Sequence, residues 1–385
     1  MKIVYILPSE GMYGDNMAIM KIMPHLIKLG VEPFFVLPHE RRSEIINTLE
    51  KYEYPYILEP STFPNYWTSY SSIRAILGRL KRIYLIRPKA YAKVLASVKT
   101  FNPKIIHTNS STSLLGYKLA HDLSIPHLWH IREYGKLDHG WQYFPSKCSF
   151  IHKINSPLNY SVCITNSIYK YFGSPSKGET IYDGVFDIDT VPNISEVDEN
   201  YFLYVGRLSK PKGVETVIHA FLKFIENEQS YSRLKIAGTG SLEYSQYLKD
   251  ICDKHVEGSK VDFLGYRTDV YNLMTKAKAI IVASEFEAFG FITAEAMYNG
   301  CAVIAHNTGG TKMQLDNGVM YTGNEIGLRY NNSAELVERM RFLSTTNKKD
   351  IITMVKYAQK TVLHFYAANK SANQIFNKYC TIIEK

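Results

Sequence analysis

Short runs of β-branched and aromatic residues alternate with helix-patterned segments along almost the whole chain, and this alternation restricts the fold more than any other feature. In the first half, segments 16–30 and 112–123 repeat apolar residues at helical spacing. The strand-like runs around them are KIVYIL (2–7), PFFVL (33–37), KIIHT (104–108), PHLWHI (126–131) and YSVCITN (160–166). A repeated strand–helix–strand order predicts an α/β fold with a parallel sheet covered by helices on both faces.

The alternation stops near residue 190 and then restarts, which indicates two domains. Segment 187–200 (DIDTVPNISEVDEN) is acidic, contains a proline and lacks periodicity, as a linker does. The strand-like runs that follow are YFLYVGRL (201–208), RLKIAGTG (233–240), KVDFLGY (260–266), KAIIVAS (278–284) and CAVIAH (301–306). We therefore predict doubly wound domains over 1–186 and 201–347. Helices are expected over 348–385, and they could cross back to the N-terminal domain. Ligands bind beyond the carboxyl ends of such strands, so two facing domains would form a cleft there.

Composition and charge narrow the class of protein. In 385 residues, 45 Lys and Arg against 36 Asp and Glu leave a formal net charge of +9, which favours anionic partners such as phosphates or an acidic membrane surface. Nucleic acid is not expected, because no recognition module is present. The five cysteines include no Cys-x-x-Cys, which argues against a disulfide framework or a zinc site and favours a reducing, cytoplasmic location. The first apolar run stops at Pro8, too early for a signal peptide or a membrane span.

A basic loop follows the strand-like run 201–205. The sequence YVGRLSKPKG (204–213) places Arg207, Lys210 and Lys212 just past the strand, before a glycine that opens a helix. Cations fixed above a strand edge suit a diphosphate, and an arginine can bind two of its oxygens at once. A solvated basic loop is the alternative interpretation for this stretch alone.

An acidic stretch, SEFEAFGFITAEAM (284–297), follows the apolar run AIIVAS. The predicted helix would present free N–H groups at about Phe289, Gly290 and Phe291, which suit a phosphate or sugar oxygens. Glu287 lies in the loop and Glu295 in the helix, and a carboxylate accepts hydrogen bonds from vicinal hydroxyls of a sugar or ribose. A capped helix with a charged first turn would explain either glutamate alone, but not their combination with Arg207 and Lys212.

Glycine-bearing turns follow three other strand-like runs. Gly11 and Gly14, in SEGMYGDN, do not form a dinucleotide fingerprint, and they indicate either a cleft-lining loop or a plain β–α turn. The IAGTGS turn, with Gly238 and Gly240, could bring backbone close to a nucleotide. Beyond the FLG turn at 263–265, Tyr266 and Arg267 could pack against a flat base; each of these signals is weak alone.

Segment 70–90 contains a basic amphipathic pattern, with apolar residues at helical spacing among six Lys and Arg residues. Such a helix could contact an anionic membrane surface or pack on the core with a solvated basic face. The Asp-x-Asp at 187–189 resembles a metal-binding motif of another transferase fold, but it lies in the linker, and no metal site is predicted there.

Taken together, the C-terminal motifs resemble the retaining glycosyltransferases of family 4. The resemblance is carried by Ser284-x-x-Glu287-x-Phe289-Gly290…Glu295-Ala296-Met297, Gly206-Arg207-Leu208…Lys212-Gly213, Gly238…Gly240, Phe263-Leu264-Gly265 and Thr308-Gly309-Gly310, in the family's order. Before the linker, Asp183-Gly184-Val185 departs from the family's Asn-Gly-Val, and Thr-Lys after Gly310 replaces a region where glutamate is usual. The family register pairs Glu287, rather than Glu285, with Glu295, because residue 293 is Thr. The implied fold is GT-B, two Rossmann-like domains facing across a cleft.

The resemblance also implies roles for particular residues. Arg207 and Lys212 would bind the donor diphosphate, Glu295 the ribose and Glu287 the hydroxyls of the donor sugar. His130, in LWHIREYG, corresponds to a histidine of the N-terminal domain that faces the donor sugar and acceptor; alone it would be read as a structural histidine. Arg132 is expected beside His130, as a residue of the acceptor or cleft loop. Gly14 and Asp15 are carried over to the acceptor or cleft loop.

The activity implied is transfer of a sugar, with retention of configuration and without a metal, from a UDP-sugar or a GDP-sugar to an acceptor hydroxyl. The acceptor would be a carbohydrate or a lipid-linked molecule, in bacterial-type cell-surface polysaccharide or glycolipid synthesis, at the inner face of the membrane if segment 70–90 binds lipid. No other cofactor is expected. The alternatives are a sugar-nucleotide epimerase on the same fold and a catalytically silent nucleotide-sugar-binding subunit.

Overall fold

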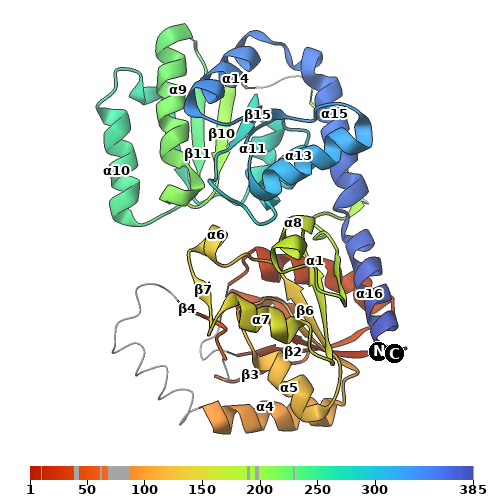
Figure 1. The fold of residues 1–385 in the computed structure, drawn as a ribbon. Helices are drawn as coiled ribbons and strands as arrows, with labels where there is room; N and C mark the ends of the chain where they lie inside the picture. Colours follow the sequence, from red (N-terminus) through yellow and green to blue (C-terminus); the bar gives the residue numbers. More distant parts are fainter. Residues whose placement is uncertain are drawn as a thin grey trace. The chain divides into compact units, whose positions relative to one another are not determined.

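The computed structural model describes residues 1–9, 11–38, 43–60, 63–67, 87–188, 191–195, 199–228 and 230–384. The chain divides into two compact units. Unit 1 comprises Met1–Gly184 and Ala368–Lys385, and unit 2 comprises Val185–Ala367. The last helix of the chain thus belongs to unit 1, although the chain reaches it only after passing through unit 2 (Figure 1). The basic segment predicted over 70–90 lies outside the described residues up to its last few positions, which begin a helix at Arg87.

Unit 1 is built on a seven-stranded parallel sheet of order β3-β2-β1-β5-β6-β8-β9. Its strands are β1 (Lys2–Ile6), β2 (Glu32–Leu37), β3 (Tyr56–Leu58), β5 (Ile105–Thr108), β6 (His127–Ile131), β8 (Asn159–Cys163) and β9 (Gly178–Thr180). Every residue of β5, β6 and β8 is buried, which explains why these strands appear as continuous runs rather than as alternating patterns. A separate antiparallel pair joins β4 (Tyr66–Trp67) to β7 (Gln142–Tyr143).

Helices cover both faces of this sheet, and the side chains of β1 show the two layers directly. Ile3 and Tyr5 pack into one apolar cluster with α1 and α16, whereas Val4 and Ile6 pack into another with α4 and α5, as the two-residue period of a strand requires. The helices are α1 (Gly14–Lys28), α2 (Glu44–Lys51), α4 (Arg87–Phe101), α5 (Leu115–Leu123), α6 (Lys136–His139), α7 (Lys147–Ile154), α8 (Asn166–Tyr171) and α16 (Ala368–Ile383). Helix α16 packs beside α1 (Figure 1).

Unit 2 repeats the architecture with a six-stranded parallel sheet of order β12-β11-β10-β13-β14-β15. The strands are β10 (Tyr201–Val205), β11 (Arg233–Ala237), β12 (Val261–Gly265), β13 (Ala279–Val282), β14 (Val303–His306) and β15 (Leu328–Tyr330). The helices are η3 (Lys210–Lys212), α9 (Val214–Glu228), α10 (Leu242–Asp253), η4 (Gly258–Lys260), α11 (Val270–Lys276), α12 (Phe291–Tyr298), α13 (Gly309–Thr322), α14 (Ser333–Thr345) and α15 (Lys348–Phe365). Helices α9 and α14 pack together over one face of the sheet, in a core that includes Phe202, Leu234 and Ile304.

The prediction of two parallel-sheet, Rossmann-like α/β domains is therefore confirmed. In each sheet the strand order turns back beside the first strand, β1 in unit 1 and β10 in unit 2. At such a reversal the neighbouring loops leave the carboxyl ends of the strands in opposite directions and open a ligand-binding crevice. In unit 2 these are the loops after β10 and β13, which carry the basic and acidic motifs.

Candidate functional site

The loop after β10 is held tightly against the loop after β13. The backbone N–H of Glu285 donates to the carbonyl of Pro211 at 2.9 Å. Gly213 adopts a left-handed conformation (φ +70°), and a Cβ at this position would lie 2.1 Å from the carbonyl oxygen of Ala283. Because only glycine permits both the turn and the close approach, the two loops are brought within side-chain reach.

This close approach brings together the predicted carboxylate, Glu287, and the predicted cation, Lys212. Lys212 Nζ lies 2.6 Å from Glu287 Oε1, and the hydroxyl of Ser284 donates to the same carboxylate oxygen at 2.6 Å. The Lys212 and Glu287 side chains are 37% and 20% exposed, so the pair is partly desolvated but open to solvent. A ligand can therefore reach both charges. Sequence reasoning assigned no role to Ser284, although it ends the strand-like run 278–284.

The start of α12 is shaped by Gly290, which caps the helix with φ +89°. The buried side chain of Gln314 donates from Nε2 to the carbonyls of Phe289 and Gly290, at 2.7 and 3.0 Å. The ring of Phe289 is buried, so this residue can offer a ligand only its backbone. The first N–H groups of a helix have no intrahelical partners, and those near Phe291 carry the partial positive charge of the helix start.

Glu295 lies one turn into α12, and its side chain accepts a hydrogen bond from the Tyr271 hydroxyl at 3.2 Å. Burial raises the pKa of Glu295, and the hydrogen bond from Tyr271 partly offsets this effect. A second donor, such as a ribose hydroxyl, would favour the ionised form further. The structure thus brings Arg207, Lys212, Glu287, Phe289, Gly290, Phe291 and Glu295 to the loops and the helix start at the carboxyl edge of one sheet.

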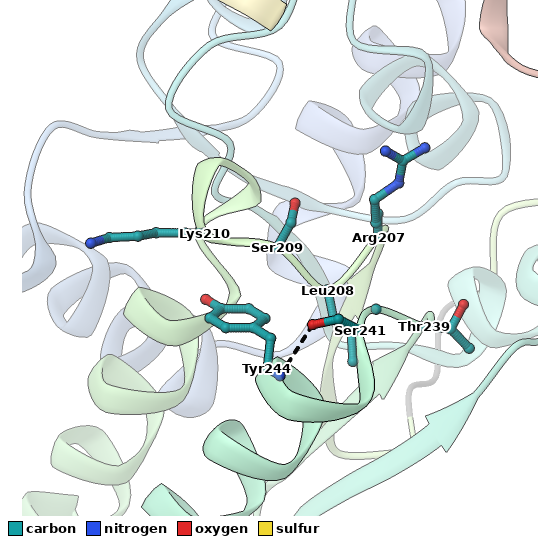
Figure 2. Close-up of a pocket in the computed structure, with 8 residues that line it drawn as sticks. Arg207, Leu208, Ser209, Lys210, Thr239, Ser241 and Tyr244 are labelled. Atoms are coloured by element: carbon teal, nitrogen blue, oxygen red, sulfur yellow. Dashed lines mark hydrogen bonds between the residues drawn. The ribbon is translucent and has the colours of Figure 1, made fainter. Parts of the chain in front are cut away.

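A hollow of about 480 Å³ lies beside Arg207 (Figure 2). Its wall is formed by Arg207, Leu208, Ser209, Lys210, Thr239, Gly240, Ser241 and Tyr244. The side chains of Arg207 and Lys210 extend in different directions in Figure 2, so they do not form one paired cation site. Arg207 is exposed and forms no ion pair with the residues that the structure describes. Its charge is therefore available to an anion.

The other predicted donor-binding residues lie on the neighbouring strand ends. Gly238 follows β11, and a Cβ there would lie 1.8 Å from the carbonyl oxygen of Gly206, so the backbones of these two turns are in contact. Gly240 makes a similar approach to Leu208, at 2.2 Å. Tyr266 is 76% exposed beyond β12, as a stacking platform would be. Arg267, in contrast, is already bound to Asp269 at 2.6 Å.

The candidate residues of unit 1 form a buried polar cluster at the carboxyl ends of β5 and β6. His130 is 1% exposed, and its Nδ1 lies 3.1 Å from Nε2 of His107 and 3.4 Å from Nη2 of Arg132. Burial, and then the charge of Arg132, lower the pKa of both histidines well below the ordinary value. Both imidazoles are therefore neutral. His130 Nε2 has no hydrogen-bond partner within the described ranges.

Arg132 is engaged inside unit 1 rather than free for a ligand. Its Nη1 donates to Asp183 Oδ1, and its Nε donates to Asn109 Oδ1 at 3.0 Å. Burial raises the pKa of Asp183, and the charge of Arg132 opposes that change. Asp183 is the position at which the chain departs from Asn-Gly-Val, and the structure supplies the reason, because the aspartate neutralises a buried arginine. A buried cation without such a partner would be strongly unfavourable.

Gly14 and Asp15 begin α1, near the same strand ends. The carboxylate of Asp15 accepts a hydrogen bond from the Ser9 hydroxyl, and its backbone carbonyl accepts one from Asn109 Nδ2 at 2.9 Å. Asn109 therefore links Asp15 to Arg132. Sequence reasoning missed His107 and Gln314. His107 could have been found, because it is a polar residue inside the apolar run KIIHT. Gln314 could not have been found, because no local pattern indicates its contacts with residues 24 and 25 positions away.

Within the described ranges, no group of three or more His, Cys, Asp or Glu side chains is arranged to hold a metal ion. The same ranges contain no helix that is both long and apolar enough to cross a membrane.

Comparisons with known proteins agree with this geometry. Residues 187–362 match the family model described as "Glycosyl transferases group 1". An uncharacterized glycosyltransferase of Methanocaldococcus jannaschii is 27% identical over 308 residues, which cover 73% of this chain and 76% of that protein. A glycogen synthase of Mycobacterium tuberculosis is 24% identical over 249 residues, covering 61% of this chain and 59% of the synthase.

Solved structures extend the likeness to both units. HepE of Anabaena, solved in complex with UDP, superposes with a TM-score of 0.76 at 19% identity, covering 99% of this chain and 100% of HepE; it was also solved with UDP-glucose. A glycosyltransferase from Rickettsia africae gives a TM-score of 0.75 at 18% identity, with 100% and 99% covered. The chain therefore has the GT-B fold, and its residues 187–362 are similar to the group 1 glycosyl transferases.

Proposed function

We propose that this protein is a retaining glycosyltransferase of family 4, which transfers a sugar from a UDP-sugar to an acceptor hydroxyl. The observation that carries the proposal is the pairing of Lys212 with Glu287 at 2.6 Å, beside the start of α12. A cation suited to phosphate and a carboxylate suited to sugar hydroxyls come from separate loops and meet at the carboxyl edge of one sheet. The UDP and UDP-glucose complexes of HepE support a uridine nucleotide as the first donor to test, with a GDP-sugar as the other candidate.

The diphosphate would bind to Arg207, Lys212 and the N–H groups at Gly290 and Phe291. When the bond between the sugar and the diphosphate breaks, its electron pair goes to the leaving oxygen, and negative charge grows there. Positive groups that already contact the bound diphosphate stabilise this charge as it develops. We therefore propose a metal-independent reaction, in which activity persists in EDTA.

The two carboxylates would hold the sugar parts of the donor. Glu287 would accept hydrogen bonds from hydroxyls of the transferred sugar, once the phosphate has taken Lys212. Glu295 would accept them from the ribose, next to the hydrogen bond that it already accepts from Tyr271. Tyr266, exposed beyond β12, would pack against the base. Glycine turns at Gly238 and Gly240 would let the nucleotide approach the backbone closely.

In unit 1, the neutral imidazole of His130 would donate a hydrogen bond from Nε2 to an oxygen of the donor sugar or acceptor. Its lowered pKa makes it a poor proton acceptor at neutral pH, so the leaving phosphate would take the acceptor proton. Attack on the face that the phosphate leaves would retain the configuration. We assign the acceptor, a carbohydrate or a lipid-linked molecule of cell-surface polysaccharide or glycolipid synthesis, to unit 1, in the cytoplasm.

The proposal is tested by incubating the protein with a panel of nucleotide sugars, first in thermal-shift measurements and then with acceptors. A donor at about 100 times its Kd stabilises the folded state by about 2.7 kcal/mol, which identifies the sugar and base. Transfer should then persist in EDTA and stop in Glu287→Gln, whereas Glu285→Gln should retain it. Complete loss in EDTA, restored by manganese, would contradict the metal-independent mechanism. Conversion of the donor without any acceptor would identify an epimerase instead.

A further inference from the structure

A chain of buried hydrogen bonds connects the last helix of the protein to His130. The hydroxyl oxygen of Tyr379, on α16, lies 2.6 Å from His107 Nδ1, and His107 Nε2 lies 3.1 Å from His130 Nδ1. Tyr379 and His107 are fully buried, and His130 is 1% exposed. Tyr379 and His107 are 272 positions apart in the sequence and meet only because α16 returns to unit 1.

Arg132 favours one direction of this chain. Its Nη2 lies 3.4 Å from His130 Nδ1, and a guanidinium can only donate hydrogen bonds. His130 Nδ1 therefore presents its lone pair, and in a neutral imidazole the single hydrogen is then on Nε2. His107 Nε2 faces the same lone pair and must donate to it. Consequently His107 Nδ1 is an acceptor, and Tyr379 donates to it.

Tyr5 is a competing acceptor, because the Tyr379 hydroxyl is also placed to donate to the hydroxyl oxygen of Tyr5, at 3.0 Å. If Tyr379 gave its single hydrogen to Tyr5, the chain would reverse and a His130 Nδ1–H would point at the Arg132 cation. Hydrogen bonds that involve a charged partner are roughly twice as strong as neutral ones. The Tyr379–His107 hydrogen bond survives in either direction, so the contact with Arg132 decides and favours the arrangement in which His130 Nδ1 accepts.

We propose that Tyr379 and His107 are positioning residues that hold the proton of His130 on Nε2. This atom makes no hydrogen bond in the described structure, and the nearest carboxylate oxygen, Asp183 Oδ1, lies 3.9 Å away, beyond hydrogen-bond distance. The proton position follows from contacts within unit 1 alone. The consequence for catalysis rests on the proposed function, because only there does the free Nε2–H donate to an oxygen of the substrate. Helix α16 thereby contributes to the site without touching a ligand.

The experiment is to label the full-length protein with ring-¹⁵N histidine and record long-range ¹H–¹⁵N correlations. The chain has 12 histidines, and the signals of interest are assigned by their loss in His107→Gln and His130→Gln. We expect both His107 and His130 to be protonated at Nε2 in the wild-type protein. In Tyr379→Phe, both should shift part of their population to the Nδ1–H form. Transfer activity should fall about three- to tenfold, as expected for one lost hydrogen bond.

Tyr5→Phe is the matched control, because it removes a buried hydroxyl beside Tyr379 that lies outside the chain to His130. It should keep the wild-type tautomers and rate. A wild-type His130 protonated at Nδ1 would overturn the proposal, and so would equal spectral shifts in the two tyrosine variants. If Tyr379→Phe does not fold, the wild-type spectrum still decides, since it shows which nitrogen is protonated. If neither the wild-type protein nor any variant transfers sugar, the proposed function is wrong, and the spectra still test the chain of hydrogen bonds to His130 separately.

Discussion

Neutralising Glu287 should strengthen the binding of UDP while it stops sugar transfer. In the free protein Lys212 Nζ is held by Glu287 Oε1 at 2.6 Å, and a diphosphate must take Lys212 away from this partner. Glu287→Gln removes the competition and also the repulsion between the carboxylate and the phosphates. Both effects favour UDP, although the same change removes the proposed acceptor of sugar hydrogen bonds.

The size of the effect follows from the exposure of the pair. At 2.6 Å two unit charges attract by about 6 kcal/mol at an effective dielectric constant of 20 and by about 1.6 kcal/mol in water. Because the side chains are 37% and 20% exposed, screening and desolvation bring the net value to about 1 kcal/mol. That energy corresponds to about fivefold tighter binding.

Isothermal titration with UDP measures this difference. Glu285→Gln is the matched control, because it makes the same charge change in the same loop at an exposed residue. It should bind UDP within about twofold of wild type, since an exposed charge is largely screened by solvent and salt. Weaker binding by Glu287→Gln, or equal affinity in the two variants, would refute the reasoning.

Three further predictions test other parts of the structure. Arg207→Ala should lower kcat/KM at least tenfold, because it removes a charge-assisted contact to phosphate of about 1.5–3 kcal/mol. Lys210→Ala is the control: the Lys210 side chain extends in another direction (Figure 2), so this variant should change kcat/KM by less than about threefold. Gly238→Ala would put a Cβ 1.8 Å from the Gly206 carbonyl oxygen, so calorimetry should find unit 2 destabilised by more than about 2 kcal/mol, as for other severe backbone clashes, and an unchanged Tm would contradict the contact. Burial lowers the pKa of His127 to about 3. Below the ordinary histidine pKa of about 6.5, the unfolded chain binds a proton at this residue and the folded protein does not, so lowering the pH from 7 to 5 should reduce the free energy of unfolding by about 2 kcal/mol. In urea unfolding, His127→Gln should lose that much less stability over the same pH range.

Much of the candidate site in unit 2 was predictable because its signals are local. A parallel strand buried on both faces is an apolar run, and the loop at its carboxyl end follows directly in the sequence. Their positions after strand-like runs therefore predict that Arg207, Lys212, Glu287 and Glu295 lie at the carboxyl edge of one sheet. What the pattern did not supply was the distance between Lys212 and Glu287, which depends on the close approach that Gly213 permits.

The buried cluster of unit 1 was less predictable, since burial and long-range partners decide the chemistry of its side chains. Arg132 was expected near an acceptor, and the structure surrounds it with Asp183 and Asn109. Tyr379 has the spacing of any core residue of a helix, so no local pattern distinguishes it.

By itself, therefore, the sequence determined two α/β domains and the strand ends at which charged residues gather, because hydrophobic periodicity and loop position are properties of neighbouring residues. Tertiary structure alone decided which charges are free, which are neutralised, and which nitrogen of His130 has an open hydrogen-bonding position. Those properties depend on desolvation and on contacts between residues as distant as Tyr379 and His107, and folding brings such contacts together without leaving a mark in either local segment.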